Sequence, residues 1–510
     1  MNAGNYVTRS ARFHGERTAI VDGDRALSYR MLDQRTNRLG NALVAMGVMR
    51  GDRVLIVLPN SAEWIEADLA IVKAGGVSVP ITAHLHEREI TEMAAFVEPR
   101  VLITSHALLA RLGAMIARLN LRIIVVGGGG DADYETLIAG SADTPLCVDV
   151  DDAVDGRIIR FTSGTTGAPK GVYLTHRNWL STACCMLLDR YDFKPDDVYV
   201  GTSPYVHAGG LWLLPALMRG ATIRVLDRFD PDTVLGLVDC DRCTVLQVVP
   251  TGLRRLLDHG QAAVMARESL RVVSYGGAPI DSVTLGEASA LMGSKLIQGY
   301  GLNESPIVST LREPCRPADP EEGKGWYQPL GREVTMAEVR ILDADGEELG
   351  EGEVGEIAVR GPMVFRHYWR NPEATENAVR QGFLRTGDLG LRGENGFLFM
   401  AGRSKDIIVT GGYNVAPPEV EEVLLAHDSV KECVVVGMPD REWGEKVTAF
   451  VVLKAGRAAD EQDLIDFCRE RLTSYKKPKN VHFVAALPVN SNGKVVRRML
   501  REQAMAGTLG

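Results

Sequence analysis

The sequence contains no apolar run close to the roughly 20 residues that a helix needs to cross a membrane. Its first residues, MNAGNYVTRSARFHGERTAI, also lack the apolar segment of a secretion signal. We therefore expect a cytoplasmic protein without an integral membrane segment.

Cysteine spacing and net charge exclude further classes of protein. The 8 cysteines show no spacing typical of a disulfide framework or a zinc site. Cys240 and Cys243 form one C-x-x-C, but no second pair follows it, so we expect both thiols to be buried. The formal net charge is −9, which does not favour general binding to nucleic acids.

A chain of 510 residues is too long for one hydrophobic core and predicts several domains. Strand-like and helix-like segments alternate over residues 19–82, as in parallel α/β layers. After about residue 330, apolar and polar residues alternate, which is typical of an antiparallel, β-rich subdomain. A compact α/β unit follows Arg403. The predicted fold is α/β, with a large N-terminal domain (1–404) and a small C-terminal domain (405–510).

Three local signals predict individual boundaries. Asp22-Gly23 between two apolar runs favours a hairpin. Ser28 can cap a helix that runs to about Met46. Pro417, followed by acidic residues, favours the start of another helix.

The stretch FTSGTTGAPKGV (161–172) has the composition of a phosphate-binding loop, because its glycines allow close backbone approach and Lys170 adds a positive charge. It is not an ordinary P-loop. Counted from Gly164, Pro169 stands where the second glycine belongs, and Gly171 stands where Ser or Thr would bind magnesium. Strand-like runs flank the loop and a helix begins only near Thr175, so we predict a strand–loop–strand. A flexible surface turn is the competing interpretation.

Six motifs together resemble those of the adenylate-forming superfamily, in its fatty-acid and aryl-CoA ligase branch. They occur in the family's order: TSGTTGAPKG (162–171), YGGAP (275–279), QGYGLNE (298–304), TGD (386–388), GRSKDIIVTGGYNV (402–415) and NSNGKVVRR (490–498). The resemblance implies an acyl-CoA synthetase that uses ATP, Mg²⁺ and coenzyme A. A carboxylic acid would first form an acyl-adenylate and then a thioester, and the small domain would move between the two steps.

The resemblance also assigns residues to the nucleotide. The loop would hold the β- and γ-phosphates through Thr162, Ser163, Gly164, Thr165, Thr166, Gly167 and Lys170. The ring of Tyr300 would cover one face of adenine, and the other face would meet Gly276, Gly277 and Ala278. The motif around Tyr300 adds three more cofactor-binding positions, Gln298, Gly299 and Gly301.

The catalytic and mobile positions follow from the same resemblance. Glu304 would bind magnesium as a hard oxygen ligand, and Asp388 would accept from both ribose hydroxyls. Arg403 would reach the ribose and phosphates, and Lys494 would bridge the α-phosphate and the attacking carboxylate. The domain rotation would take place at Lys405.

A third group of positions would contact coenzyme A and the acid. Gly412 would let the pantetheine arm pass. The segment SPYVHAGGLWLL places His207 at the family's gate position, and no aspartate lies between His207 and Leu226 to hold an α-amine. The acid-binding positions are then His207, Gly209, Gly210, Leu213, Gly276 and Gly301. Because Gly209 stands where related ligases carry an aromatic residue, we infer a bulky apolar acid, unless Trp212 and Leu213 refill the space.

One motif position departs from the family pattern, since Asn303 replaces the usual threonine before Glu304. That threonine donates to the α-phosphate, so Asn303 is a further candidate catalytic residue. The departure leaves open a ligase that mainly forms thioesters from a preformed adenylate. The same motifs would also suit an enzyme that loads a carrier protein in trans, a luciferase-like oxidase or a nucleotide sensor.

Overall fold

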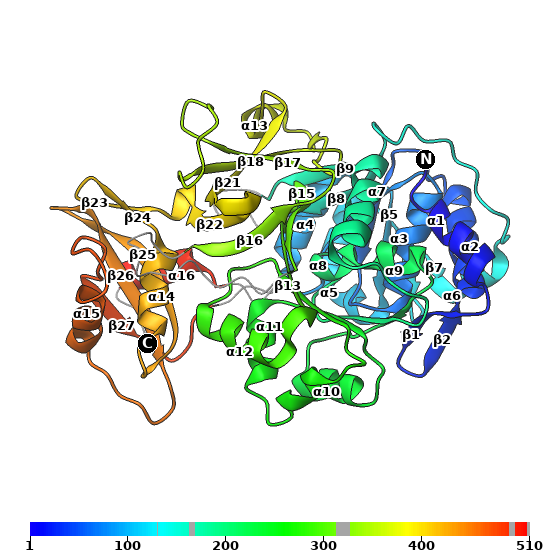
Figure 1. The fold of residues 1–510 in the computed structure, drawn as a ribbon. Coiled ribbons are helices and arrows are strands. Elements are labelled where there is room, and N and C mark those ends of the chain that lie inside the picture. The colour runs from blue at the N-terminus through cyan, green and yellow to red at the C-terminus, as the bar shows by residue number, and fades with distance from the viewer. Residues whose placement is uncertain (130, 163–168, 313–326, 489–494, 507–510) are drawn as a thin grey trace.

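The computed structural model describes residues 1–129, 131–162, 169–312, 327–488 and 495–506 (Figure 1). Two large sheets and most helices form one body, and strands β23 to β27 form a separate, smaller lobe with helices α14 to α16. These layers of sheet and helix confirm the predicted α/β fold.

The first sheet lies mainly in the N-terminal third of the chain and is largely parallel. In spatial order its strands are β19 (His367–Tyr368), β9 (Gly171–Thr175), β8 (Gly156–Phe161), β4 (Val77–Pro80), β3 (Arg53–Val57), β5 (Val101–Ser105), β6 (Arg122–Val126) and β7 (Ala132–Asp133). Its strands β3 to β6 are buried along nearly their whole length, as expected when helices cover both faces.

The second sheet joins a parallel half to the β-rich part of the chain. Its parallel half contains β10 (Val198–Gly201), β11 (Thr222–Arg224), β12 (Val245–Val248), β13 (Val272–Gly276) and β14 (Leu296–Leu302), and ends in the hairpin of β1 (Thr18–Asp22) and β2 (Arg25–Ser28). The antiparallel half contains β15 (Ser305–Leu311), β16 (Gln328–Glu333), β17 (Glu338–Leu342), β18 (Gly355–Arg360), β20 (Val379–Arg380), β21 (Phe383–Arg392) and β22 (Leu398–Arg403). In this half of the sheet, antiparallel pairing begins with β15, before the predicted change of composition near residue 330, and continues through the β-rich part that follows.

Helices cover these sheets. Those of the large body are α1 (Asn5–His14), α2 (Tyr29–Ala45), α3 (Ala62–Lys73), α4 (Glu87–Val97), α5 (His106–Leu119), α6 (Tyr134–Gly140), α7 (His176–Cys185), α8 (Ala208–Leu211), α9 (Leu213–Met218), α10 (Pro231–Asp239), α11 (Pro250–Leu257), α12 (Ser282–Met292) and α13 (Pro372–Ala378). A five-residue π-helix, η1 (Met186–Arg190), continues α7.

The smaller lobe has its own sheet and core. Its strands are β23 (Ile408–Thr410), β24 (Tyr413–Val415), β25 (Val430–Asp440), β26 (Gly444–Leu453) and β27 (Asn480–Phe483), and its helices are α14 (Pro417–Leu425), α15 (Glu461–Arg469) and α16 (Arg497–Ala506). Apolar side chains of these strands form a cluster with α14 and α15.

The local boundary predictions are confirmed. β1 and β2 pair antiparallel around Asp22, and the Ser28 hydroxyl accepts from Met31 N at the start of α2. Thr175 caps α7 and Pro417 begins α14. The cysteine prediction is half wrong: Cys243 is buried, but Cys240 is exposed because it lies just after the last residue of α10.

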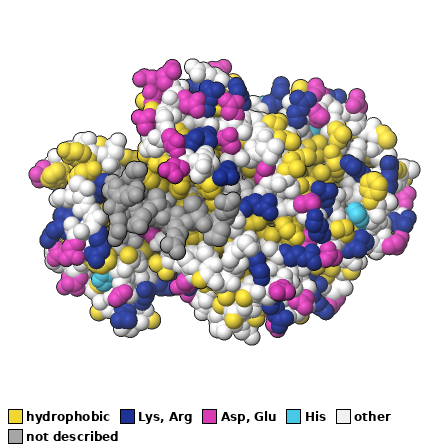
Figure 2. Space-filling view, in the orientation of Figure 1, with side chains coloured by type: hydrophobic (Ala, Val, Ile, Leu, Met, Phe, Trp, Pro, Cys, Tyr) yellow, Lys and Arg dark blue, Asp and Glu magenta, His cyan; other side chains and the backbone are white. Residues whose placement is uncertain are grey.

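The surface carries charges of both signs. Figure 2 shows basic and acidic side chains interspersed over the face in view, without a large patch of one sign. In the part of the chain that the structure describes, no helix is long and apolar enough to span a bilayer.

Candidate active site

The predicted phosphate loop connects two paired strands. β8 and β9 pair antiparallel, and Thr162 N donates to Lys170 O at 3.0 Å where the loop begins and ends. This confirms the two predicted strands on either side of the stretch. Ser163, Gly164, Thr165, Thr166 and Gly167 lie outside the described residues.

A buried carboxylate lies close to this loop. Glu304 is 8% exposed, and its Oε1 accepts from the Tyr368 hydroxyl at 2.6 Å. Lys170 Nζ lies 5.0 Å from the centre of the Tyr368 ring. Because β19, which carries Tyr368, pairs with β9, the sheet brings the lysine of the loop and Glu304 to the same tyrosine. Sequence reasoning missed Tyr368, since no motif contains it.

A second group surrounds Asp388. Its Oδ2 accepts from the Tyr300 hydroxyl at 2.8 Å, and Arg403 Nε lies 3.0 Å from its Oδ1. Asp388 is buried, whereas Arg403 is half exposed. Burial, together with Asp388, raises the pKa of Tyr300 well above its ordinary value. A carboxylate accepts up to about four hydrogen bonds, so Asp388 retains capacity for ribose hydroxyls.

Asn303 lies in the sequence between Tyr300, of the group around Asp388, and Glu304. Its side chain already forms a hydrogen bond within the protein. Its Nδ2 donates to Phe161 O, at the end of β8, at 3.1 Å. A threonine hydroxyl has one proton, whereas the amide has two, so one N–H remains for a ligand. Asn303 therefore ties the turn after β14 to the base of the phosphate loop.

The glycines of β13 and β14 allow the two strands and their surroundings to approach closely. Gly276 pairs with Gly299, and a side chain on Gly276 would overlap the Gly299 carbonyl oxygen. A side chain on Gly301 would lie 2.5 Å from Pro306 O. Gly277, with φ +82°, faces open space. Two neighbouring predicted positions are Ala278, which is partly exposed, and Gln298, which is buried.

The predicted acid-binding segment does not offer the space that we inferred. His207 precedes α8, and its N–H donates to Pro204 O at 2.9 Å. A side chain on Gly209 would overlap Ser203 O, and one on Gly210 would overlap Tyr205 O. Both glycines therefore serve close packing of α8 against the preceding loop. This removes the reason for inferring a bulky apolar acid.

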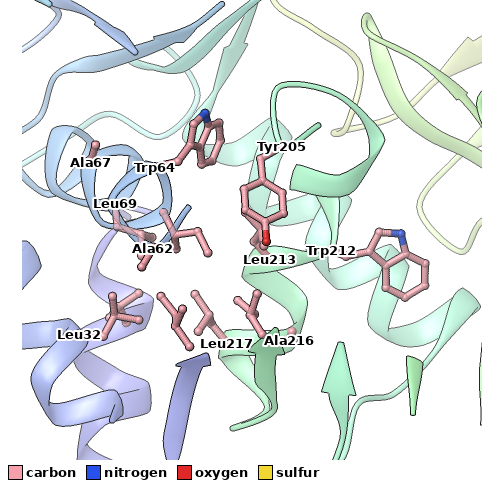
Figure 3. Close-up of a cluster of buried hydrophobic side chains, with 14 of the residues drawn as sticks. Leu32, Ala62, Trp64, Ala67, Leu69, Tyr205, Trp212, Leu213, Ala216 and Leu217 are labelled. Carbon is pink, nitrogen blue, oxygen red and sulfur yellow. The ribbon is translucent and has the colours of Figure 1, made fainter. Parts of the chain in front are cut away.

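The residues that follow these glycines are part of the core. Trp212 is 2% exposed and stacks on Tyr199 at 6.0 Å between ring centres. Leu213 is buried in the same cluster as Trp64 and Tyr205, and Figure 3 shows it next to Tyr205. Trp212 and Leu213 thus fill the space, which was the competing interpretation of this segment.

The predicted hinge lies between the sheets. Lys405 belongs to a short 3₁₀ turn, η6 (Ser404–Asp406), between β22 and β23. Gly412 is exposed with φ +83° and has open space beside it. Lys494 lies outside the described residues. Hinge motion and the roles of these residues stay predictions.

A magnesium ion fits this site only together with phosphates. No three His, Cys, Asp or Glu side chains gather as a metal cage within the described ranges. Glu304 offers one buried carboxylate oxygen, which suits an ion that keeps water and phosphate ligands.

Comparison with known proteins identifies the family. Residues 7–369 match the AMP-binding enzymes, and residues 419–494 match the AMP-binding enzyme C-terminal domain. The chain belongs to the AMP-binding enzyme family. It is an AMP-forming acid–thiol ligase of the adenylate-forming superfamily, and ATP and coenzyme A are its cosubstrates.

Relatives resemble this AMP-binding enzyme along its whole length. A feruloyl-CoA synthase from Amycolatopsis sp is 34% identical, with 98% of each chain covered. The fatty acid–[acyl-carrier-protein] ligase ScoC from Streptomyces coeruleorubidus is 31% identical, covering 98% of this chain and 96% of that protein.

Among solved structures, MatB from Rhodopseudomonas palustris is 32% identical and covers 100% of both chains. The TM-score is 0.90 for its ATP-bound structure but 0.79 for its apo structure. Because both comparisons are with the same protein at 32% identity, the difference in TM-score reflects the conformation of MatB. This AMP-binding enzyme is more similar to the ATP-bound form.

Proposed function

We propose that the protein converts a carboxylic acid without an α-amine into its coenzyme A thioester, through an acyl-adenylate. The observation that carries this proposal is a pair of buried carboxylates: Glu304 shares Tyr368 with the lysine of the loop, and Asp388 lies between Tyr300 and Arg403. A nucleoside triphosphate needs both kinds of group: positive charge at its phosphates and a hydrogen-bond acceptor at its ribose.

In the first step, a carboxylate oxygen of the acid attacks the α-phosphorus of ATP. A P–O bond to the acid forms, the bond to the β-phosphate breaks and pyrophosphate leaves. Asp388 fixes the ribose, Tyr300 covers adenine, and Lys494 neutralises charge between the two reactants. Glu304 would hold Mg²⁺ together with the phosphates, and the ion would supply further neutralising charge.

In the second step, the sulfur of coenzyme A attacks the acyl carbon and AMP leaves with the bonding electron pair. Rotation at Lys405 removes Lys494 and brings Gly412 to the site, so the thiol can enter. The absence of an aspartate between His207 and Leu226 favours acids without an α-amine.

The experiment combines the purified protein with ATP, Mg²⁺, coenzyme A and a panel of acids. We expect an acyl-CoA, AMP and pyrophosphate in equal amounts, measured by mass spectrometry and a pyrophosphate assay. Formation of ADP would contradict the proposal. Mass spectrometry of any acid or adenylate that copurifies would narrow the panel.

A carrier protein is the second candidate acceptor, because the relative ScoC is named a ligase for an acyl-carrier-protein. Replacing coenzyme A by a phosphopantetheinylated carrier protein in the same assay compares the two acceptors. A larger kcat/KM with the carrier would make it the acceptor.

A further inference from the structure

Three arginines are buried in the part of the chain that the structure describes, and they differ in their partners. Arg157 forms an ion pair with Asp68, with Nη1 2.9 Å from Oδ1. Arg160 donates from Nε and Nη2 to Val206 O and is attracted by the charge of Glu304. Arg190 is 5% exposed and forms no ion pair with any described carboxylate.

The described carboxylate that attracts Arg190, that of Asp189, already has partners. Asp189 precedes Arg190, but its carboxylate accepts from Thr335 N at 3.1 Å and from the Thr335 hydroxyl at 2.6 Å. Within the described residues, Arg190 donates a single hydrogen bond, from Nε to Thr310 Oγ1 at 3.3 Å. The guanidinium has five N–H groups in a fork that matches a carboxylate, so the described residues use only a small part of its capacity.

The backbone directs Arg190 inward, toward the strands that carry predicted site residues. Arg190 ends the π-helix η1, and π-helical turns are frequently found at functional sites. Its guanidinium covers Gly299, because a side chain on Gly299 would overlap it. Gly299 immediately precedes Tyr300 and pairs with Gly276 on the neighbouring strand. Arg190 therefore lies beside one glycine of the predicted nucleotide site, Gly299, whose strand neighbour Gly276 belongs to the predicted nucleotide and acid site.

Arg190 has no counter-ion among the described residues, and a buried charge without one is costly, so its retention calls for an explanation. Burial lowers the pKa of Arg190 to about 10, and Asp189 offsets this only in part. At neutral pH the guanidinium is still charged. An anionic ligand would supply the missing counter-charge.

We propose that Arg190 recognises a second carboxylate of the substrate, remote from the carboxylate that is activated. The proposal rests on the function proposed above and narrows its substrate to dicarboxylic acids. Arg190 is then a specificity-determining residue.

The test compares acids of equal length that differ at the remote end, such as hexanoate with hexanedioate and octanoate with octanedioate. The readout is kcat/KM for AMP formation in the presence of coenzyme A. We expect the native protein to prefer the dicarboxylate by about 10-fold or more for at least one length, as for a hydrogen bond to a charged group. Preference for the monocarboxylate at every length would overturn the inference.

Two variants separate recognition from support of the fold. Arg190→Met keeps the side-chain length without charge and should lower kcat/KM for the dicarboxylate roughly 10- to 100-fold, with the monocarboxylate within about threefold. Arg190→Lys should restore part of the preference. Arg219→Met is the matched control, because Arg219 pairs with Asp192 at the surface and should leave the preference unchanged.

The outcomes distinguish the two proposals. An equal loss for both acids in Arg190→Met would mean a structural role and refute the inference. If Arg190→Met fails to fold, the preference for dicarboxylates over monocarboxylates in the native protein and in Arg190→Lys still tests the inference. If the native protein activates monocarboxylic acids only, this inference fails alone, whereas absence of AMP formation with every acid rejects the proposed function itself.

Discussion

Substitution of Glu422 tests a contact between the smaller lobe and the large body. Glu422 lies in α14, and its Oε2 accepts from Ser282 N, at the start of α12, at 3.5 Å. Burial, with smaller contributions from Asp281 and Glu421, raises the pKa of Glu422 to about 7, although the Ser282 N–H opposes this. Asp281 is held in place as the cap of α12, and Glu421 pairs with Arg497.

The raised pKa of Glu422 determines how the stability of the contact between the smaller lobe and the large body changes with pH. Below pH 4.5, the ordinary pKa, Glu422 is protonated with or without the contact, so the contact carries no penalty. As pH rises from there, the free carboxyl ionises first and the contact is progressively destabilised. Above pH 7 the penalty is complete, at roughly 3 kcal/mol as an upper limit and about 2 kcal/mol after allowance for solvent.

Glu422→Gln removes this penalty because an amide stays neutral and can still accept from Ser282. We attach one dye to the smaller lobe and one to the large body. In the native protein the distance between the dyes should increase between pH 5 and 8, and in Glu422→Gln it should not change. The measurement is resonance energy transfer without ATP. Glu442→Gln, at an exposed site of the same lobe, should behave as the native protein. Identical pH dependence in native protein and Glu422→Gln would refute the reasoning.

Three further predictions concern the reaction. Lys494→Ala should abolish pyrophosphate release but leave thioester formation from a supplied acyl-adenylate, and equal loss of both would contradict the split role. Asn303→Thr removes the bond to Phe161 O and should change adenylation about 10-fold or more if the α-phosphate contact controls the rate; an unchanged rate of pyrophosphate release would show that Asn303 substitutes adequately. Tyr368→Phe leaves Glu304 without its donor and should raise KM for MgATP about 10-fold with the acid KM unchanged, whereas an effect on the acid alone would disprove this role.

Local chemistry explains why some of the fold could be predicted from the sequence. Ser28, Thr175 and Pro417 act within one helical turn, so their neighbours in sequence are also their neighbours in space. The two strands that flank the stretch 161–172 were also predicted from local sequence. The motifs also named Asp388 and Tyr300, but not the hydrogen bond between them.

Residues brought together by the tertiary fold could not be found in this way. Tyr368 reaches Glu304 only because β19 pairs with β9. The burial of Arg190 depends on a π-helical turn that no composition signal marks. A glycine in a sequence is also ambiguous, because it can provide space for a ligand or allow two backbone segments to touch. The motif comparison favours the first role for Gly209, and the Ser203 carbonyl shows the second.

The close approach of α8 to the preceding loop has a practical consequence for protein engineering. A mutant library aimed at new acids would ordinarily randomise Gly209 and Gly210, since both stand in the predicted acid-binding segment. Any side chain there must first displace the carbonyls of Ser203 and Tyr205, so most library members would be lost to misfolding rather than gain a new preference. A library should instead randomise positions whose side chains do not point at backbone atoms, and it should keep Gly209 and Gly210 unchanged.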